Sequence, residues 1–161
     1  MMLNIRIICV GRIKERHFAD ASDEYMKRLA GYCKTEIVEL AEHRTPPEPS
    51  AAQKAAALDK ERIAVEGKLP PGAHVIALCA EGRETDSPGL SEMLADFAVR
   101  GISRLCFIIG GSFGLHESIK TKADLRLSLS KMTYPHSLAR VVLLEQLYRA
   151  LNLSEGGKYH K

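Results

Sequence analysis

The sequence predicts an α/β fold in which a mostly parallel sheet carries helices on both faces. Apolar, β-branched runs alternate along the chain with segments whose apolar residues recur at helical spacing. Two of the runs, residues 75–79 and 105–109, are apolar throughout, which is typical of strands buried on both faces. The 161 residues have the length of one domain, and no repeat or linker divides them. We therefore expect a single domain over residues 1–161.

The first half of the chain predicts two strands and two helices. Its expected elements are, in order, a strand at 3–10, a helix at 16–29, a strand at 35–41, a loop at 43–50 and a helix at 51–66. The strands are apolar and β-branched, and the first helix has Phe18, Tyr25 and Leu29 at helical spacing. Three prolines in four positions predict the loop, after which Ser50 can cap the Ala-rich helix.

The second half continues the alternation. Its expected elements are a strand within 70–82, a helix from Ser87 to about Gly101, a strand at 104–111, a short helix at 116–124, a strand at 125–130 and a closing helix at 138–153. Ser87 is expected to be the N-cap of its helix, with Pro88 at the first helical position. The closing helix has an apolar surface that is wide for a helix covering one sheet face. Core packing explains most of that surface, and pairing with a second copy of the chain is the further expectation.

The composition is that of an ordinary globular protein, with 45% apolar and 27% charged residues. No apolar run approaches the roughly 20 residues that span a bilayer. The first residues lack the charged start and small-residue cleavage site of a signal peptide. We therefore expect a cytoplasmic protein that has no membrane partner.

The cysteines and histidines do not form metal-binding patterns. There are four cysteines without a C-x-x-C pair and six histidines without an HxH or HxxxH pair. We therefore expect reduced, buried thiols and no metal.

Positive charge is concentrated in the last quarter of the chain. Residues 120–161 hold eight Lys or Arg and three acids, whereas the net charge of the whole chain is only +3. This distribution is consistent with binding to phosphate or another anion, and equally with a solvated basic face that has no partner.

Three of the expected strands end in unusual residues. These ends are Leu78–Gly82, the glycine-rich stretch Gly110–Gly114 and Ser130–His136. Ligands of open α/β sheets gather beyond the carboxyl ends of the strands, so these ends form one pocket if their strands are neighbours. The stretch GGSFG is not GxGxxG and no GxxxxGK[ST] occurs, which disfavours dinucleotide, phosphate-loop and flavodoxin-like nucleotide binding. Taken alone, the glycines fit a simple tight turn equally well.

Two histidines are candidates for chemistry. His136 precedes Arg140 by one helical turn, and His160 follows Tyr159 in the tail GGKYHK. A single histidine near a helix start is more often structural than catalytic, and residues at a chain end are often frayed. From the residues alone, the structural interpretation is therefore favoured for both.

Longer motifs carry a family resemblance. FIIGGSFGLH, then LSLSKMTYPHSLARVVLLEQLYRA and the terminal GGKYHK, with ICVGRIKE and VIALCAEG earlier, resemble the ribosomal RNA large-subunit methyltransferase H family of the SPOUT superfamily. The resemblance implies S-adenosylmethionine as methyl donor and N3 of a pseudouridine in the 23S rRNA of the ribosome as acceptor. It also implies a homodimer and a C-terminal trefoil knot that forms the donor pocket.

The resemblance also implies the donor-binding residues. They are Leu78, Gly110, Leu129, Ser130, Lys131, Met132, Thr133 and Tyr134. Their main chain is expected to bind an adenine edge while the apolar side chains form walls. Cys79 stands where relatives often have an acid, so donor affinity is expected to be weaker here.

The reaction requires a base for the acceptor N3–H. We hypothesise that His136 or His160 takes this proton, in one chain or across a dimer interface. Arg140 is then expected to stabilise charge on the imide oxygens, and Tyr159 to stack on or orient the base. Two alternatives remain at this point: a SPOUT enzyme for another rRNA or tRNA site, and a non-catalytic RNA- or ribosome-binding module.

Overall fold

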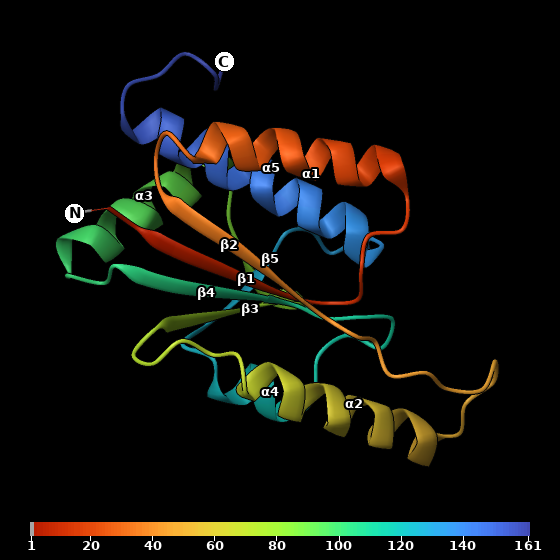
Figure 1. Cartoon of the computed structure of the whole chain (residues 1–161). Helices are drawn as coiled ribbons and strands as arrows, with labels where there is room; N and C mark the ends of the chain where they lie inside the picture. Colours follow the sequence, from red (N-terminus) through yellow and green to blue (C-terminus); the bar gives the residue numbers. More distant parts are fainter. Residues whose placement is uncertain (1) are drawn as a thin grey trace.

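The computed structural model describes residues 2–161 and contains one five-stranded sheet flanked by five helices (Figure 1). The elements are β1 (Asn4–Val10), α1 (Arg16–Leu29), β2 (Lys34–Leu40), α2 (Ala51–Glu66), β3 (His74–Glu84), α3 (Ser87–Val99), β4 (Arg104–Ile109), α4 (Glu117–Lys122), β5 (Leu125–Ser128) and α5 (His136–Ser154). The strand order is β2-β1-β4-β3-β5, and each neighbouring pair is parallel. The predicted α/β class is confirmed. Among residues 2–161 no helix is long and apolar enough to cross a membrane.

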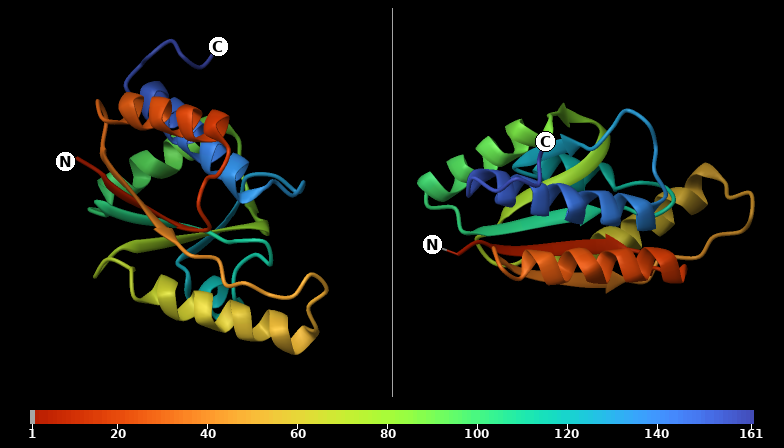
Figure 2. Two further views of the ribbon diagram at one scale, coloured as in Figure 1. Left: turned by 45° about the vertical axis from the view of Figure 1, so that its right-hand side comes forward. Right: turned by 90° about the horizontal axis from the view of Figure 1, so that it is seen from above.

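The helices form a layer on each face of the sheet. Figures 1 and 2 show α1, α3 and α5 on one face and α2 and α4 on the other. Side chains of β1 alternate between the two layers, with Ile7 in the cluster under α5 and Ile8 in the cluster that includes Val65 of α2. Both side chains are fully buried. The apolar character of the central strands therefore results from their having two covered faces.

Of the two helix caps that the sequence predicted, one is confirmed and the other is wrong. Ser50 caps α2 as predicted: its Oγ accepts from the Gln53 N–H at 3.1 Å, while the Gln53 side chain accepts from the Ser50 N–H at 2.8 Å. The prediction of Ser87 as a cap was wrong, because the carboxylate of Asp86 accepts from the Gly89 N–H at 2.8 Å. Ser87 is instead the first helical residue, and its hydroxyl donates to Gln146 at 2.6 Å.

The last helix begins two residues before its predicted start. It starts at His136, with Pro135 as the N-cap, so that His136 lies on the first turn of α5. Proline lacks an N–H and is tolerated where a helix starts, because the first N–H groups have no partner within the helix.

The pairing of β3 with β5 changes register part of the way along the strands. Leu127 of β5 lies opposite both Leu78 and Arg83 of β3, because the register shifts between those two residues. A Cβ atom at Gly82 would lie 2.8 Å from the main chain of Leu127, so only glycine permits this approach. The Ser128 hydroxyl donates to the Ala80 carbonyl at 2.9 Å. Residues 79–82 therefore pass tightly across β5.

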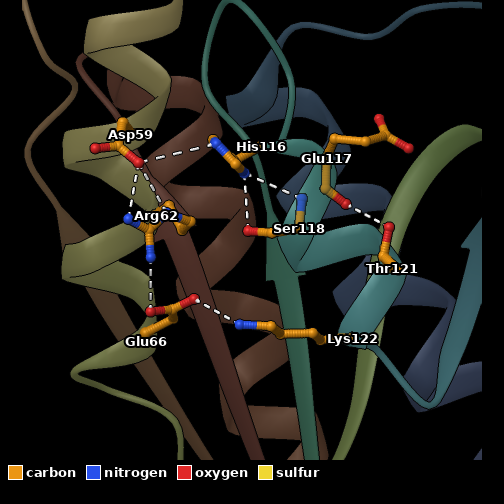
Figure 3. A network of polar contacts seen from close by, with 8 residues as sticks. All are labelled: Asp59, Arg62, Glu66, His116, Glu117, Ser118, Thr121 and Lys122. Carbon is orange, nitrogen blue, oxygen red and sulfur yellow. Dashed lines mark hydrogen bonds and ion pairs between the residues drawn. The ribbon is translucent and has the colours of Figure 1, made fainter.

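A polar network ties α2 to the start of α4 on the face away from α5 (Figure 3). Arg62 bonds Asp59 at 2.7 Å and Glu66 at 3.0 Å on its own helix. His116 accepts from the Ser118 N–H at 3.0 Å through Nδ1, which caps α4, and its Nε2 lies 3.9 Å from Asp59. The short helix α4 is thus fixed by its cap as well as by buried Ile119.

Candidate active site

Residues from the three unusual stretches meet in one pocket, although Leu78–Gly82 does not end its strand as expected, because β3 continues to Glu84. Their strands are neighbours in the order β4-β3-β5, as a shared pocket requires. The pocket has about 580 Å³ of empty space, part of it open to solvent. Its lining includes Leu78, Gly110, Leu129, Ser130, Met132, Thr133 and Tyr134, together with Cys79 and His136. Seven of the eight residues predicted to bind a donor therefore line it.

Lys131 is the predicted donor-binding residue that does not line the pocket. Its side chain is 85% exposed, and its Nζ lies 3.6 Å from Glu84. A ligand in the pocket would therefore contact Lys131 through its main chain and not through its side chain.

The segment after β5 presents free main-chain groups to the pocket. The Met132 N–H donates to the Ser130 hydroxyl at 2.9 Å. The other main-chain groups of residues 131–134 form no hydrogen bond within residues 2–161. Met132 is 77% exposed and forms part of the pocket's rim. Unpaired main-chain groups beside apolar walls suit a flat, polar-edged ring such as adenine. An adenosyl group therefore fits the chemistry of this pocket.

The glycine-rich stretch after β4 is a tight turn. Its Gly114 N–H donates to the Gly111 carbonyl at 3.0 Å, and Gly114 has φ of 74°. A Cβ at Gly110 would lie 2.5 Å from Gly114, so a side chain cannot be placed there. The turn interpretation and the pocket interpretation both hold, because the closed turn brings the Gly110 main chain to the pocket wall.

His136 lies at the boundary of the pocket. Its ring packs on Gly11 so closely that a Cβ at Gly11 would be 2.9 Å from the ring, and Gly11 has φ of 109°. Nδ1 of His136 is buried without a hydrogen-bond partner. The same residue also lines a second hollow that includes Gly11 and Ser137.

Arg140 lies beneath His136 and is only 4% exposed. It donates to a carboxylate oxygen of Glu39 at 2.9 Å and to the Gly11 carbonyl at 3.2 Å. The Ile13 N–H also donates to Glu39, at 3.3 Å. Arg140 therefore fixes the turn against which His136 packs. Glu39 was missed in the sequence, where nothing links it to a residue 101 positions away.

The tail lies at the opposite end of α5 (Figure 1). The Tyr159 N–H donates to Asn152 at 3.1 Å, its ring lies 4.8 Å from the Tyr148 ring, and the Arg149 guanidinium lies 4.6 Å from it. Burial, and then the neighbouring Tyr25, raise the pKa of Tyr159 to about 12. Asn152 follows His136 on α5 by 16 positions, which is about 24 Å along the helix.

The candidate catalytic residues therefore form two groups in one chain. His136 and Arg140 lie at the pocket, whereas Tyr159 and His160 lie with the far end of α5. No group of three His, Cys, Asp or Glu side chains within residues 2–161 is arranged to hold a metal ion.

Comparisons with known proteins agree with this architecture. The family model described as a predicted SPOUT methyltransferase matches residues 3–160. The chain is 45% identical over 159 residues to the ribosomal RNA large subunit methyltransferase H of Clostridioides difficile (strain 630), covering 99% of this chain and 100% of that protein. It is 43% identical, with the same coverage, to the protein of that name from Bifidobacterium animalis subsp. lactis (strain AD011).

A solved structure supports the fold. The structure of a probable methyltransferase from Bordetella pertussis Tohama I superposes with a TM-score of 0.58 at 16% identity, covering 92% of this chain and 96% of that one. The family match and the full-length identities together assign the sequence: the chain belongs to the SPOUT methyltransferase family.

Proposed function

We propose that this chain transfers a methyl group from S-adenosylmethionine to N3 of a pseudouridine in the 23S rRNA of the large ribosomal subunit. The observation that carries the proposal is the pocket at the ends of β4 and β5 and beside the register shift of β3, whose lining matches the donor-binding residues implied by the family resemblance. The names of the full-length relatives support rRNA as the acceptor. The excess of basic residues in 120–161 is consistent with a nucleic-acid substrate.

The donor would be held by the glycine turn and by the segment after β5. Leu78, Leu129 and Met132 supply apolar walls, and the main chain from Lys131 to Tyr134 supplies hydrogen-bonding groups. When bound, the donor offers a sulfonium methyl group to a nucleophilic nitrogen. The chain then has to align that nitrogen and remove its proton, since alignment contributes much of the rate of a displacement.

His136 is the proton acceptor that one chain can supply at the pocket. It is the one histidine in the lining, and histidine is the side chain that most often acts as a general base. Arg140 already bonds Glu39 and Gly11, so its first role in this proposal is to position the turn behind His136. Its positive charge lies under the site and also favours negative charge on the imide oxygens.

Tyr159 and His160 act in this proposal from a second chain. About 24 Å of helix separates their anchor at Asn152 from His136, so they do not reach the pocket of their own chain from this position. A homodimer that places the tail of one chain over the pocket of the other unites the two groups. There Tyr159 would orient the acceptor base and His160 would be the alternative proton acceptor.

The C-terminal trefoil knot and the cytoplasmic location belong to the same proposal. The knot is supported by the way residues 79–82 cross closely over Leu127 of β5, which suits a chain threaded through a tight opening. The location is supported by the acceptor, because ribosomes are cytoplasmic.

Mass mapping of rRNA tests the acceptor directly. Ribosomes that lack the modification are incubated with the protein and labelled donor, and each rRNA is digested and mapped. A methyl group on N3 of one 23S pseudouridine is the expected result. Label in tRNA or at another rRNA site would identify a different SPOUT substrate, and absence of both label and donor binding by calorimetry would indicate a binding module.

A further inference from the structure

A second hollow lies beside the candidate active site, on the other side of His136. It has about 1260 Å³ of empty space, part of it open to solvent, against about 580 Å³ for the donor pocket. Its walls come from the loop after β1, the loop after β2 and the glycine turn after β4. His136 is the residue that lines both. We call this hollow the lateral groove.

Three cations on the walls of the lateral groove have no counter-ion. Arg12, Lys14 and Arg44 are exposed, and none of them takes part in an ion pair or a side-chain hydrogen bond within the part of the chain described. By contrast, Arg6, which lies on the body of β1, bonds Glu36 at 2.9 Å. Side chains that are positive and unpaired around a concavity attract an anion.

The acids of the lateral groove form no ion pair with these cations within residues 2–161. Glu42 accepts from the Ser112 N–H at 2.7 Å, so its carboxylate is engaged with the glycine turn. Glu15 is exposed at the start of α1 and forms no ion pair within residues 2–161.

The groove also has an aromatic wall. Phe113 is half-buried in the glycine turn, and Lys54 of α2 lies 5.6 Å from the centre of its ring. Free cations beside an aromatic ring are the combination that binds single-stranded nucleic acid, because the cations contact phosphates and a base stacks on the ring.

The walls are held in place before any ligand arrives. Glu42 fixes the glycine turn to the loop after β2, and the buried carboxylate of Glu61 accepts from the His43 N–H at 3.0 Å. Burial raises the pKa of Glu61. Arg140 and Glu39 fix the loop after β1 from below. The groove is therefore preorganised, which lowers the cost of binding.

We infer that the lateral groove binds the single-stranded RNA next to the acceptor nucleotide, with phosphates at Arg12, Lys14 and Arg44 and a base against Phe113. The inference rests on the proposed function, since it assigns a position to the strand that carries the acceptor. A nucleotide at the donor pocket continues into neighbouring nucleotides, and the path past His136 leads into this groove.

Methylation kinetics on unmodified ribosomes test the inference. The triple variant Arg12→Ala/Lys14→Ala/Arg44→Ala is expected to raise KM for ribosomes at least roughly tenfold, with donor affinity by calorimetry unchanged, because only phosphate contacts are lost. Phe113→Leu, which keeps an apolar side chain, is expected to raise KM through lost stacking. The matched control is Lys34→Ala. Lys34 is exposed at the start of β2, whereas the groove is lined by residues that follow the end of β2, so the KM of this variant should equal that of the parent protein.

Binding of a 12-nucleotide oligouridine gives a readout that does not need catalysis. Its affinity should fall with salt, and the triple variant should reduce the slope of log affinity against log salt by about 2, or roughly 0.7 for each phosphate contact of a single strand. Thermal unfolding of each variant confirms that it is folded.

The outcomes separate this inference from the proposed function. If the parent protein methylates ribosomes and the triple variant has the same KM and the same oligouridine affinity, the groove is not an RNA site. If the parent protein does not methylate ribosomes, the proposed function fails, and the oligouridine slope alone decides the groove. Unchanged RNA affinity with a loss of dimer in light scattering would assign the groove to a second copy and overturn the inference.

Discussion

Arg140 carries a positive charge into an almost fully buried position, where Glu39 and the Gly11 carbonyl compensate it. A buried ion pair adds little stability in itself, but removing one partner leaves the other charge desolvated and unpaired. Glu39 is therefore as important to the region behind His136 as Arg140 itself.

Glu39→Gln is expected to lower the free energy of unfolding by about 1–3 kcal/mol, because it leaves the buried charge of Arg140 without its counter-ion. The cost stays in this range because the side chain at position 39 is 37% exposed, so water partly replaces the lost interaction. Urea unfolding measures the change. Glu36→Gln is the control, because Glu36 lies on the same strand in a more exposed pair with Arg6 and should cost less than about 1 kcal/mol. Equal costs for the two variants would contradict the structural role of Glu39.

Cys79 is the half-exposed thiol of the four cysteines, and it lines the donor pocket. Burial, and then Glu81, raise its pKa, so less thiolate is present at neutral pH and labelling should accelerate as pH rises. Maleimide should modify Cys79 alone in the native protein, as read by intact mass, and S-adenosylmethionine should slow that reaction. A labelling rate that the donor leaves unchanged would place the donor away from Cys79.

Single residues divide into those that the sequence could assign and those that it could not. The pocket residues after β4 and β5 were predictable because the ends of parallel strands meet at one edge, whereas Leu78 lies inside β3. The burial of Arg140 was not, because its partners are 101 and 129 positions away. The position of Tyr159 beside Asn152 was hidden for another reason: the glycines before it allow many paths.

Periodicity located the elements well, and failed where a local contact decides. α1 and α2 have the predicted bounds, because apolar spacing and the Ser50 cap agree. Asp86 displaced Ser87 as a cap, since both residue types are good caps and only the carboxylate meets the Gly89 N–H. β3 extends beyond its apolar run to Glu84, because residues 83–84 pair with β5 after the register shift.

Gly82→Ala tests the close passage of β3 across β5. The added Cβ would lie 2.8 Å from the main chain of Arg126 and Leu127, which cannot move as a side chain can. The expected cost is about 1–3 kcal/mol of unfolding free energy, measured by urea unfolding.

Gly67→Ala is the matched control for this substitution. It ends α2 with φ of −66°, and its added Cβ would meet neighbours at an ordinary 3.5 Å. Its stability should be unchanged or slightly higher, because alanine restricts the unfolded chain. If Gly82→Ala were equally harmless, the strands would not be as close as described.

At the scale of the whole molecule, the sequence predicted α/β layers but not the order β2-β1-β4-β3-β5. Strand order depends on contacts between distant segments, which apolar patterns do not encode. The two groups of candidate catalytic residues, at opposite ends of α5, likewise appear only once the helix is placed.

Co-expression of two variants tests whether a dimer unites these groups. His136→Ala and His160→Ala are each expected to lose most activity alone, because the first removes the proton acceptor of the pocket and the second a tail residue that lies over the pocket of the other chain. Together they should recover roughly a quarter of parental methylation, because half of the dimers are mixed and each has one intact site. Pairing His136→Ala with the double variant His136→Ala/His160→Ala leaves no intact site and is the control. Full activity of His160→Ala alone would remove the tail from the mechanism.

The bonds from Arg140 back to Gly11 and Glu39 also constrain when the protein can fold during its own synthesis. α5 packs on the same face of the sheet as α1 and α3, yet it follows both in the chain and is synthesised after them. A nascent chain stalled before residue 136 exposes the apolar undersides of α1 and α3 and has a site without its histidine. Chains that end before α5 are therefore expected to bind chaperones until that helix has been synthesised.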